Sequence, residues 1–403
     1  MAGHPRERGP RLLVLGAGPA QLGLLEAAQA RGVWTAVADR DPAAPGFALA
    51  GRRCIVSTED EPALERLAAA LELDGIISPG TDWPVAVAAR VAEKLGLPHP
   101  LTPRTSMLAT NKLRQRERLA AAGVPQPPWQ VVTDGRVEVE PPCVVKAPDR
   151  QGQKGLSLVL SVSDLGAAVE TARAASRVGA ALVEALVDGP EVTVIGFDGR
   201  SLAVTDRITA DPPAFGVALA HVWPSDADGR ALGVAERAVA ALGIDRGPTY
   251  TQLRIGPDGP EVMEVAARLG GGHDAELVEA AVGIPLNDLA IDAALGRETL
   301  VTQCHKPRAG GAVTRFLVAP PGILESVEIP DSLEGVLRVR IYRGPGYVYA
   351  PLRRGGDRAG AVLAVGDSRD EALARADAAA ERIRFVTADA GALVDERASR
   401  RQA

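Results

Sequence analysis

Two lysines and two glycines in the middle of the chain have types and spacing that suit a polyphosphate. Lys146 ends a short apolar run that starts at Cys143, and Lys154 follows in a loop between Gly152 and Gly155. Glycines let a backbone approach an anion closely, and lysines offset its charge. The last glycine of a P-loop is followed directly by Lys-Ser or Lys-Thr, so this loop is of another kind. Taken alone, the stretch is equally typical of a solvated hairpin.

An amide, a carboxylate and an arginine follow at positions that suit a cation and an anionic substrate. Gln252 and Glu264 lie on two strands that the sequence predicts to form a hairpin across residues 256–259, and Arg268 comes just after the second strand. Mg²⁺ binds through one or two carboxylates plus substrate phosphates. An arginine offers a planar fork to a carboxylate or phosphate. We therefore expect these three side chains to lie close together, although an ordinary ion pair between Glu264 and Arg268 is the simpler alternative.

The elements that must position these residues divide the chain into three parts, so the fold class is α/β and α+β. Residues 1–104 alternate short apolar strands with helices, which is typical of a doubly wound domain. Residues 105–305 begin with a helix predicted at 105–122 and contain a lid subdomain at about 125–190. Residues 306–403 indicate a small α+β domain with a long helix at 368–385.

Within the lid subdomain, Ser163 and Asp164 are predicted to open a helix, since both are good N-cap types. His221 is expected in a loop near the site, where a structural role for it is at least as plausible as a chemical one.

The composition and the ends of the chain exclude several classes of protein. The chain has 403 residues, is 46% hydrophobic and 24% charged, and carries a net charge of −6, which argues against a general nucleic-acid or membrane-surface binder. Its three cysteines, Cys54, Cys143 and Cys304, show no paired spacing, so we expect a reducing cytoplasm. We find no signal-peptide pattern and no membrane-spanning segment. The arginine-rich end is expected to fray.

The first strand leads into the turn GAGPAQLG, whose pattern GxGxxxxG matches the dinucleotide fingerprint only loosely. Asp39, after the next strand, occupies the position at which such a domain holds a ribose. The interpretation that we favour is structural: Gly16 and Gly18 allow a tight turn, and Asp39 caps a loop. An NAD-dependent dehydrogenase is the alternative, but it would leave the middle of the chain unexplained.

Four segments together resemble the ATP-grasp superfamily, and the resemblance covers nearly the whole chain. They are NKLRQRERLAAAGVPQP, VVKAPDRQGQKG, VEALVDGPE and VMEVAARLGGGH. GAGPAQLGLLEAA followed by Asp39 resembles the N-terminal pre-ATP-grasp domain, and the tail resembles the small C-terminal domain. Within the superfamily the chain is most similar to carboxylate–amine ligases, namely the purine-pathway synthetases and the L-amino-acid ligases.

The resemblance implies a nucleotide role for the first two segments. Lys112 and Lys146 would hold the α- and β-phosphates of ATP. Lys154 and the backbone around Gly152 and Gly155 would cover the β- and γ-phosphates.

The resemblance also implies roles for the last two segments. Glu184 and the backbone of Leu186 would contact the adenine edge, and Glu191 would hold the ribose hydroxyls. Glu264 would be the main ligand of Mg²⁺ (or Mn²⁺). Arg268 would bind the substrate carboxylate or the acyl-phosphate oxygens.

Two positions depart from the pattern of the superfamily. Gln252 stands where members usually have Asp or Glu, and Ala266 stands where Asn is common. Glutamine can act as a ligand through its carbonyl but supplies no charge, so the resemblance leaves the second metal ion open. The two departures favour a third interpretation, a non-catalytic ATP-binding module.

The reaction that the resemblance implies joins a small-molecule carboxylate to an amine. The γ-phosphoryl of ATP would pass to the carboxylate, an amine would attack the acyl-phosphate, and ADP and phosphate would leave. Formation of AMP and pyrophosphate would contradict this. Because no arginine cluster accompanies GAGPAQLG, we favour an amino acid or similar carboxylate over a ribonucleotide of purine synthesis or a specialised-metabolite precursor. These ligases are often homodimers.

Two further expectations concern single residues. Arg315, Arg343 and Arg358 in the tail are expected to face the site. Lys146→Ala is expected to abolish ATP turnover while leaving the fold intact, because a lysine at a strand end contributes little to a core.

Overall fold

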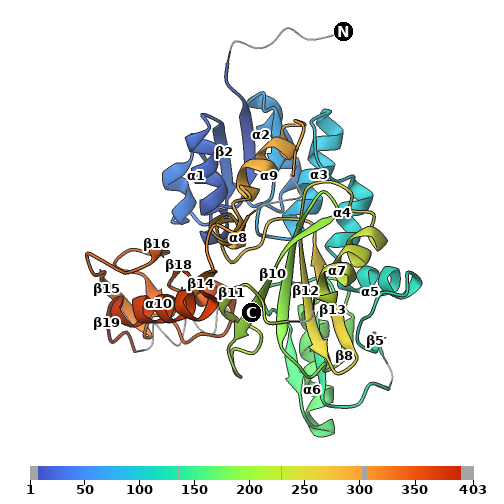
Figure 1. The fold of residues 1–403 in the computed structure, drawn as a ribbon. Helices are drawn as coiled ribbons and strands as arrows, with labels where there is room; N and C mark the ends of the chain where they lie inside the picture. Colours follow the sequence, from blue (N-terminus) through green and yellow to red (C-terminus); the bar gives the residue numbers. More distant parts are fainter. Residues whose placement is uncertain (1–7, 135, 228, 302–305, 392–403) are drawn as a thin grey trace.

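The computed structural model describes residues 8–134, 136–227, 229–301 and 306–391. Figure 1 shows its ribbon, with the first part of the chain at the top and the tail at the lower left. Cys304, the predicted boundary at residue 305 and the arginine-rich end lie outside the described residues. Within those residues, no helix combines the length and the apolar character that crossing a membrane requires.

The first part of the chain forms a parallel sheet, because short apolar strands alternate with helices there. The strand order is β3-β2-β1-β4, and every neighbouring pair is parallel. The strands are β1 (Arg11–Leu15), β2 (Trp34–Asp39), β3 (Arg52–Ile55) and β4 (Gly75–Ile77). The helices are α1 (Leu22–Ala30), α2 (Glu61–Ala70) and α3 (Trp83–Leu95).

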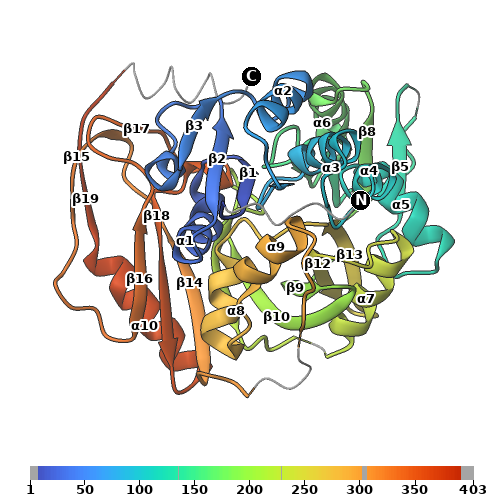
Figure 2. The ribbon, with the colours of Figure 1, turned by 90° about the horizontal axis from the view of Figure 1, so that it is seen from above.

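Both faces of this sheet are covered, one of them partly by a helix from later in the chain. Successive side chains of a strand point to opposite faces. Leu13 and Leu15 therefore pack with α2 and α3, whereas Leu12 and Val14 share a core with α1 and with α9 (Leu286–Ala294). Figure 2 shows α9 beside α1. Helix α9, which follows the predicted magnesium ligand Glu264 in the sequence, is thus packed onto the first domain.

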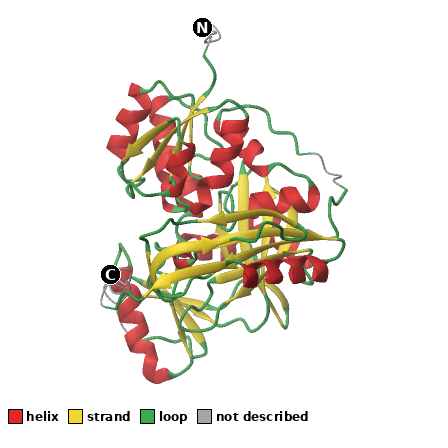
Figure 3. Ribbon diagram, turned by 90° about the vertical axis from the view of Figure 1, so that its left-hand side faces the viewer, coloured by secondary structure: helices red, strands yellow, loops and turns green. Residues whose placement is uncertain are grey.

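An antiparallel sheet of eight strands runs through the middle of the molecule in the order β13-β12-β9-β10-β11-β14-β18-β16. Figure 3 shows it as a yellow layer below the first sheet. Five strands come from the middle of the chain: β9 (Glu191–Phe197), β10 (Arg200–Thr209), β11 (Ala218–Trp223), β12 (Pro248–Gly256) and β13 (Gly259–Ala266). Three come from the tail: β14 (Gly311–Leu317), β16 (Val336–Ile341) and β18 (Gly360–Gly366).

Helices α7 (Arg230–Ala241), α8 (Asp274–Val282) and α10 (Arg369–Arg382) pack against this sheet. His221 lies on β11, which is in the middle of this sheet between β10 and β14. The prediction of a loop around His221 was therefore wrong. The predicted helix to residue 385 is also too long, because α10 ends at Arg382 and Phe385 belongs to β19.

The predicted lid region contains a separate antiparallel sheet in the order β5-β8-β6-β7. Its strands are β5 (Trp129–Val132), β6 (Cys143–Lys146), β7 (Ser157–Val159) and β8 (Ala181–Ala185). Helix α6 (Val162–Ala175) covers one face and shares an apolar core with these strands. Ser161 caps α6 by accepting the Ser163 N–H, so the expectation that Ser163 and Asp164 open the helix was wrong by two residues.

The helix predicted at 105–122 is in fact two helices, α4 (Pro103–Ala109) and α5 (Lys112–Ala121). Asn111 separates them, because its backbone is extended, with φ of −131°, and its side chain accepts the N–H of Arg114. Asparagine competes with the helix in this way and favours N-caps. The break places Lys112 in the first turn of α5, beside the pocket.

The tail is joined to the central sheet, because β14 pairs with β11. A small sheet in the order β17-β15-β19 lies at its outer end. The strands of that sheet are β15 (Gly322–Glu328), β17 (Val348–Tyr349) and β19 (Arg384–Ala388). The division of the chain at residues 104 and 305 stays a prediction.

Candidate functional site

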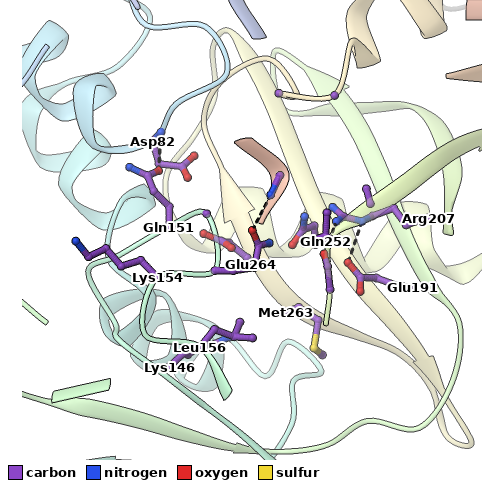
Figure 4. Close-up of a pocket in the computed structure, with 18 of the residues that line it drawn as sticks. Asp82, Lys146, Gln151, Lys154, Leu156, Glu191, Arg207, Gln252, Met263 and Glu264 are labelled. Carbon is purple, nitrogen blue, oxygen red and sulfur yellow. Dashed lines mark hydrogen bonds and ion pairs between the residues drawn. The ribbon is translucent and has the colours of Figure 1, made fainter. Parts of the chain in front are cut away.

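A cavity of about 580 Å³ lies where the first domain, the lid, the central sheet and the tail meet. Figure 4 shows Asp82, Gln151 and Lys154 on one side of it and Glu191 and Arg207 on the other. Most of the predicted site residues line it: Lys112, Lys146, Gly152, Lys154, Glu184, Leu186, Glu191, Gln252, Glu264 and Arg268. Gly155 does not line the cavity. The position of its missing side chain faces α6, where a Cβ would lie 2.6 Å from the Cβ of Ala175.

Lys146 and Glu184 form a buried ion pair between neighbouring strands of the lid. The Nζ of Lys146 lies 2.6 Å from Glu184, whose other oxygen lies 2.6 Å from the Nε of Arg116. Burial alone would raise the pKa of Glu184, but the two cations lower it overall. Burial lowers the pKa of Lys146. Lys146 ends β6, as expected, and its ammonium group is buried and paired.

Lys112 pairs with Glu264, the predicted metal ligand, at 2.8 Å. Gln252 and Glu264 are directly opposite each other on β12 and β13, as the predicted hairpin requires. Burial disfavours the charged form of both side chains, but the attraction between the two charges is stronger than this effect. The pKa of Lys112 is therefore raised and that of Glu264 is lowered. Glu264 is thus an ionised carboxylate that faces the cavity beside a neutral amide.

The glycine loop lies across the cavity and contacts both neighbouring parts of the molecule. Gly152 has φ of 65° and Gln153 has φ of 62°, a left-handed conformation that glycine adopts freely and other residues rarely. The Gln151 side chain accepts the N–H of Asp82 at 2.9 Å, and that of Gln153 accepts the N–H of Gly355 at 3.3 Å. The loop is therefore held by the first domain on one side and by the tail on the other.

Arg268 and Asp82 join the central sheet to the first domain. The Arg268 Nε lies 2.6 Å from Asp82, which follows β4 at the carboxyl edge of the parallel sheet. Burial opposes the charge of Arg268, but Asp82 outweighs it and the pKa of Arg268 is raised. The guanidinium also lies over the ring of Tyr250, 5.4 Å from its centroid.

Glu191 and Arg207 face each other across neighbouring strands at 3.0 Å. Arg207 also donates to the hydroxyl of Tyr250 at 3.0 Å. The carboxylate at the predicted ribose position is therefore held in place by an arginine. Sequence reasoning did not single out Arg207 or Tyr250.

His221 lines the cavity and pairs with Asp274 at 2.6 Å, both of them buried. Asp274 also accepts the N–H of Gly272. Burial would raise the pKa of Asp274, but His221 and this N–H lower it to about 2. A Cβ on Gly272 would lie 2.5 Å from the imidazole, so this glycine is needed for the approach of His221.

Two of the three tail arginines that were expected at the site line the cavity, namely Arg343 and Arg358. Arg343 pairs with Asp41 of the first domain at 3.0 Å. Arg358 lies over the ring of Phe316 and donates to backbone carbonyls. Arg315 pairs instead with Asp377 beside a second hollow under α10, so the expectation for Arg315 was wrong.

Comparisons with known proteins agree with this geometry. The family model described as "L-amino acid ligase C-terminal domain 2" matches residues 315–388. The L-amino acid ligase from Bacillus licheniformis superposes with a TM-score of 0.80 at 22% identity, over 95% of this chain and 100% of that one. The chain belongs to the ATP-grasp superfamily. It is an ATP-grasp ligase of the carboxylate–amine type, the ADP-forming class that makes C–N bonds.

Two sequence relatives extend this assignment. This chain is 30% identical over 332 residues to the uncharacterised protein y4rH of Sinorhizobium fredii (strain NBRC 101917 / NGR234). The aligned part covers 76% of this chain and 67% of the relative. The chain is 28% identical over 414 residues to the formate-dependent phosphoribosylglycinamide formyltransferase of Burkholderia lata, which covers 94% of this chain and 96% of the relative.

Two site residues of the ATP-grasp ligase that sequence reasoning missed carry a recognisable signal. Arg116 lies four positions after Lys112 on α5, and residues at this spacing share a helix face. Asp82 follows a short parallel strand, at the sheet edge where ligands of open α/β folds bind. Tyr250 and Arg207 have no such local signal, because only the pairing of β9, β10 and β12 brings them together.

Proposed function

We propose that this protein is an ATP-dependent carboxylate–amine ligase that forms an amide through an acyl-phosphate and releases ADP and phosphate, acting on an amino acid or similar small carboxylate. The observation that carries the proposal is that Lys112, Lys146, Glu264 and Arg268 line one cavity, under a glycine loop held on both sides. Cations and a carboxylate so placed suit phosphoryl transfer, in which catalysis is mainly positioning and charge stabilisation.

In this proposal each part of the cavity takes one part of the substrates. Lys112 and Lys146 hold the α- and β-phosphates, while Lys154 and the backbone at Gly152 cover the β- and γ-phosphates. Gly155 faces α6 and takes no part in this contact. Closure of this loop excludes water, which would hydrolyse the acyl-phosphate.

The remaining walls hold the nucleoside and the reacting acid. The backbone of Leu186, beside Glu184, meets the adenine edge, and Glu191, already oriented by Arg207, holds the ribose. Arg268 binds the carboxylate or acyl-phosphate oxygens.

The donor set fits one divalent cation better than two. Glu264 supplies one carboxylate and Gln252 one amide carbonyl, and in the described part of the chain no cluster of three or more metal-binding side chains was found. One or two carboxylates plus substrate phosphates suffice for Mg²⁺, which when bound neutralises phosphate charge. Glu264 and Gln252 would hold it after Lys112 moves from Glu264 to a phosphate. Mn²⁺ is an alternative to be tested.

The test is a panel of carboxylates and amines with detection of ADP. The twenty proteinogenic L-amino acids serve as carboxylates, singly and in pairs, with Mg²⁺ and ATP. ADP release that requires both substrates, together with an amide product of the summed mass less water, supports the proposal. Release of AMP and pyrophosphate contradicts it. Tight ATP binding without turnover for any pair indicates a non-catalytic module instead.

A ribonucleotide substrate is the second candidate, favoured by the likeness to the formyltransferase. The first glycine turn speaks against it. The Ala17 N–H already donates to Asp39 at 2.8 Å, and the Gln21 side chain fills the space beside Gly16. A phosphate or an NAD pyrophosphate therefore has little access to this turn. Adding formate and a glycinamide ribonucleotide to the panel separates the two candidates.

Three coarser features remain proposals alongside the activity: the division into parts at residues 104 and 305, a cytoplasmic location and a homodimer. Light scattering on a size-exclusion column tests the last of these. A mass near twice 41.8 kDa is expected for the dimer.

A further inference from the structure

A chain of polar contacts runs from the cavity, through the interior, to helix α1 of the first domain. Tyr342 lines the cavity, and its hydroxyl lies 2.7 Å from the Nε2 of His273. The Nδ1 of His273 lies 3.3 Å from Glu276, which Arg340 contacts at 3.2 Å. Arg340 in turn pairs with Glu26 at 2.8 Å. None of these residues belongs to the nucleotide part of the site.

This series of polar contacts is buried, and it depends on a positive φ at His273 and on a close approach to Gly23. His273 is 5% exposed and has φ of 60°, a conformation that is uncommon for residues other than glycine. A Cβ on Gly23 would lie 2.2 Å from Glu276, so the last glycine of the GAGPAQLG turn makes room for this carboxylate. Strained backbone and close glycine approaches persist where the surroundings demand them.

The charges fix which way the hydrogen bonds run. Burial would raise the pKa of Glu276, but its hydrogen bond with His273 and the nearby guanidinium of Arg340 lower it to about 2. Glu276 is therefore an acceptor, and the Nδ1 of His273 must carry the proton. In a neutral ring Nε2 is then unprotonated and accepts the O–H of Tyr342. The oxygen lone pairs of Tyr342 remain for a donor in the cavity.

We propose that Tyr342, His273 and Glu276 form the relay that takes the proton from the attacking amine. The inference rests on the proposed ligase function and names the base for its second half. An ammonium N–H donates to the Tyr342 oxygen, which takes this proton while its own passes to His273. The neutral amine then forms the C–N bond with the acyl carbon, and the C–O bond to phosphate breaks with its electron pair on phosphate. The departing phosphate takes the second proton of the nitrogen and leaves as hydrogen phosphate, so that the neutral amide remains. His273 returns the proton to solvent between turnovers.

Tyr342 is the catalytic residue of this relay, while His273 and Glu276 act through it. The charged and titratable groups that face the pair of rings are Glu276 on α8, Arg340 on β16 and Arg358 in the tail, and Glu26 on α1 pairs with Arg340 behind them. The positive charges of Arg340 and Arg358 disfavour a further positive charge at the two rings, whereas the carboxylate of Glu276 favours it.

The first test separates amine activation from everything before it. Tyr342→Phe and His273→Asn are compared with the wild type for amide formation with an amine substrate and for hydroxamate formation with hydroxylamine, which is largely unprotonated at neutral pH. Asparagine tolerates the backbone conformation at position 273. We expect amide formation to fall about 10²–10⁴-fold, the usual range for a general base. Hydroxamate formation should stay within about twofold. Tyr349→Phe, which removes a hydroxyl outside the cavity, is the control.

The pH profile provides a readout that a merely structural role would not move. In Tyr342→Phe the amide rate should rise about tenfold per pH unit with the fraction of free amine, and the wild-type rate should rise less steeply. Equal losses of amide and hydroxamate, or equal pH slopes, would overturn the relay. A wild type that forms no hydroxamate with any carboxylate would instead refute the ligase function.

The second test needs no substrate. The chain has five histidines, so ¹⁵N-labelled imidazoles can be assigned with His273→Asn. We expect a proton on the Nδ1 of His273, where Glu276 accepts it, and an Nε2 resonance that shifts in Tyr342→Phe. A proton on Nε2, or on both nitrogens, would leave no place for the proton of the amine and would overturn the proposal.

Discussion

The carboxylate of Glu184 is almost fully buried and forms two ion pairs. Its oxygens lie 2.6 Å from the Nζ of Lys146 and 2.6 Å from the Nε of Arg116. Arg116 also donates to the carbonyls of Val262 and Met263 on β13. One guanidinium therefore fixes the lid to the edge of the central sheet, directly behind the residues that would hold phosphate. A buried charge of this kind is stable only while its partners are present.

The role of Lys146 can be separated from its contribution to stability. Lys146→Met should abolish ATP-dependent ADP release and lower the free energy of unfolding by about 1–3 kcal/mol, since Glu184 keeps only Arg116. Lys94→Met, at an exposed lysine paired with Glu65 on the surface, should change the latter by less than about 1 kcal/mol. Urea unfolding and an ADP assay measure the two effects. An unfolding curve for Lys146→Met that overlays the wild type would contradict the burial argument.

Asp274 should make stability depend on acid pH. Its pKa in the folded protein, about 2, lies below the unfolded value, so its contribution is present above about pH 4 and is lost as the pH falls towards 2. We expect Asp274→Asn to lose about 2 kcal/mol at pH 6 and much less near pH 2.5. Urea unfolding at both pH values measures this, with the exposed Asp245→Asn as control. A loss that is equal at the two pH values would mean that packing, not charge, is at stake.

Among the elements, the glycine loop is the piece of the site whose position depends on two neighbours. Its glutamines contact the first domain through Asp82 and the tail through Gly355. The loop contains Gly152, Gln153 and Gly155, all with positive φ, a backbone conformation that glycine adopts freely. Its closed position is thus set by two side-chain hydrogen bonds rather than by burial in a core.

Removing both contacts should loosen the loop without harming the sheet beneath it. In the double variant Gln151→Ala/Gln153→Ala we expect KM for ATP to rise several-fold and ATP hydrolysis without amide formation to increase, because water reaches the acyl-phosphate. The ratio of ADP to amide measures the uncoupling. Gln29→Ala, at an exposed position of α1, is the matched control. An unchanged ratio in the double variant would show that other contacts close the loop.

The sequence predicts many strands and the hairpin of this fold well, because each has a local signature. Apolar runs ended by glycine or proline predict β1, β6, β9 and β12 to within a residue or two. Where two local signals compete the prediction fails, as at Asn111, whose capping strength outweighs a helical pattern. Contacts between distant strands are not local at all, so Arg207, Tyr250 and the chain from Tyr342 to Glu26 became visible only in three dimensions.

At the scale of the whole molecule, cores cross the predicted boundaries except at the lid. One core joins residues of α1, β9, β12 and α9. The lid has its own core between α6 and its sheet. A shared core favours cooperative unfolding, whereas a separate core permits local opening.

Single-tryptophan variants test this division. The chain has four tryptophans, of which Trp34 lies on β2 and Trp129 on the lid strand β5. With the other three replaced by phenylalanine, we expect the Trp129 fluorescence to change at a lower urea concentration than that of Trp34. Coincident midpoints would show that the lid unfolds with the rest. Calorimetry of the wild type provides the independent check.

The pairing of a neutral Gln252 with a single carboxylate has a consequence for the supply of metal in the cell. An enzyme that binds only the cation carried by its nucleotide responds to the concentration of MgATP and not to free Mg²⁺ in excess of it. Such an enzyme keeps its rate when free magnesium is scarce. Titrating free Mg²⁺ at fixed MgATP should therefore give a flat rate for this chain and a rising one for Gln252→Glu, which restores a second charge opposite Glu264.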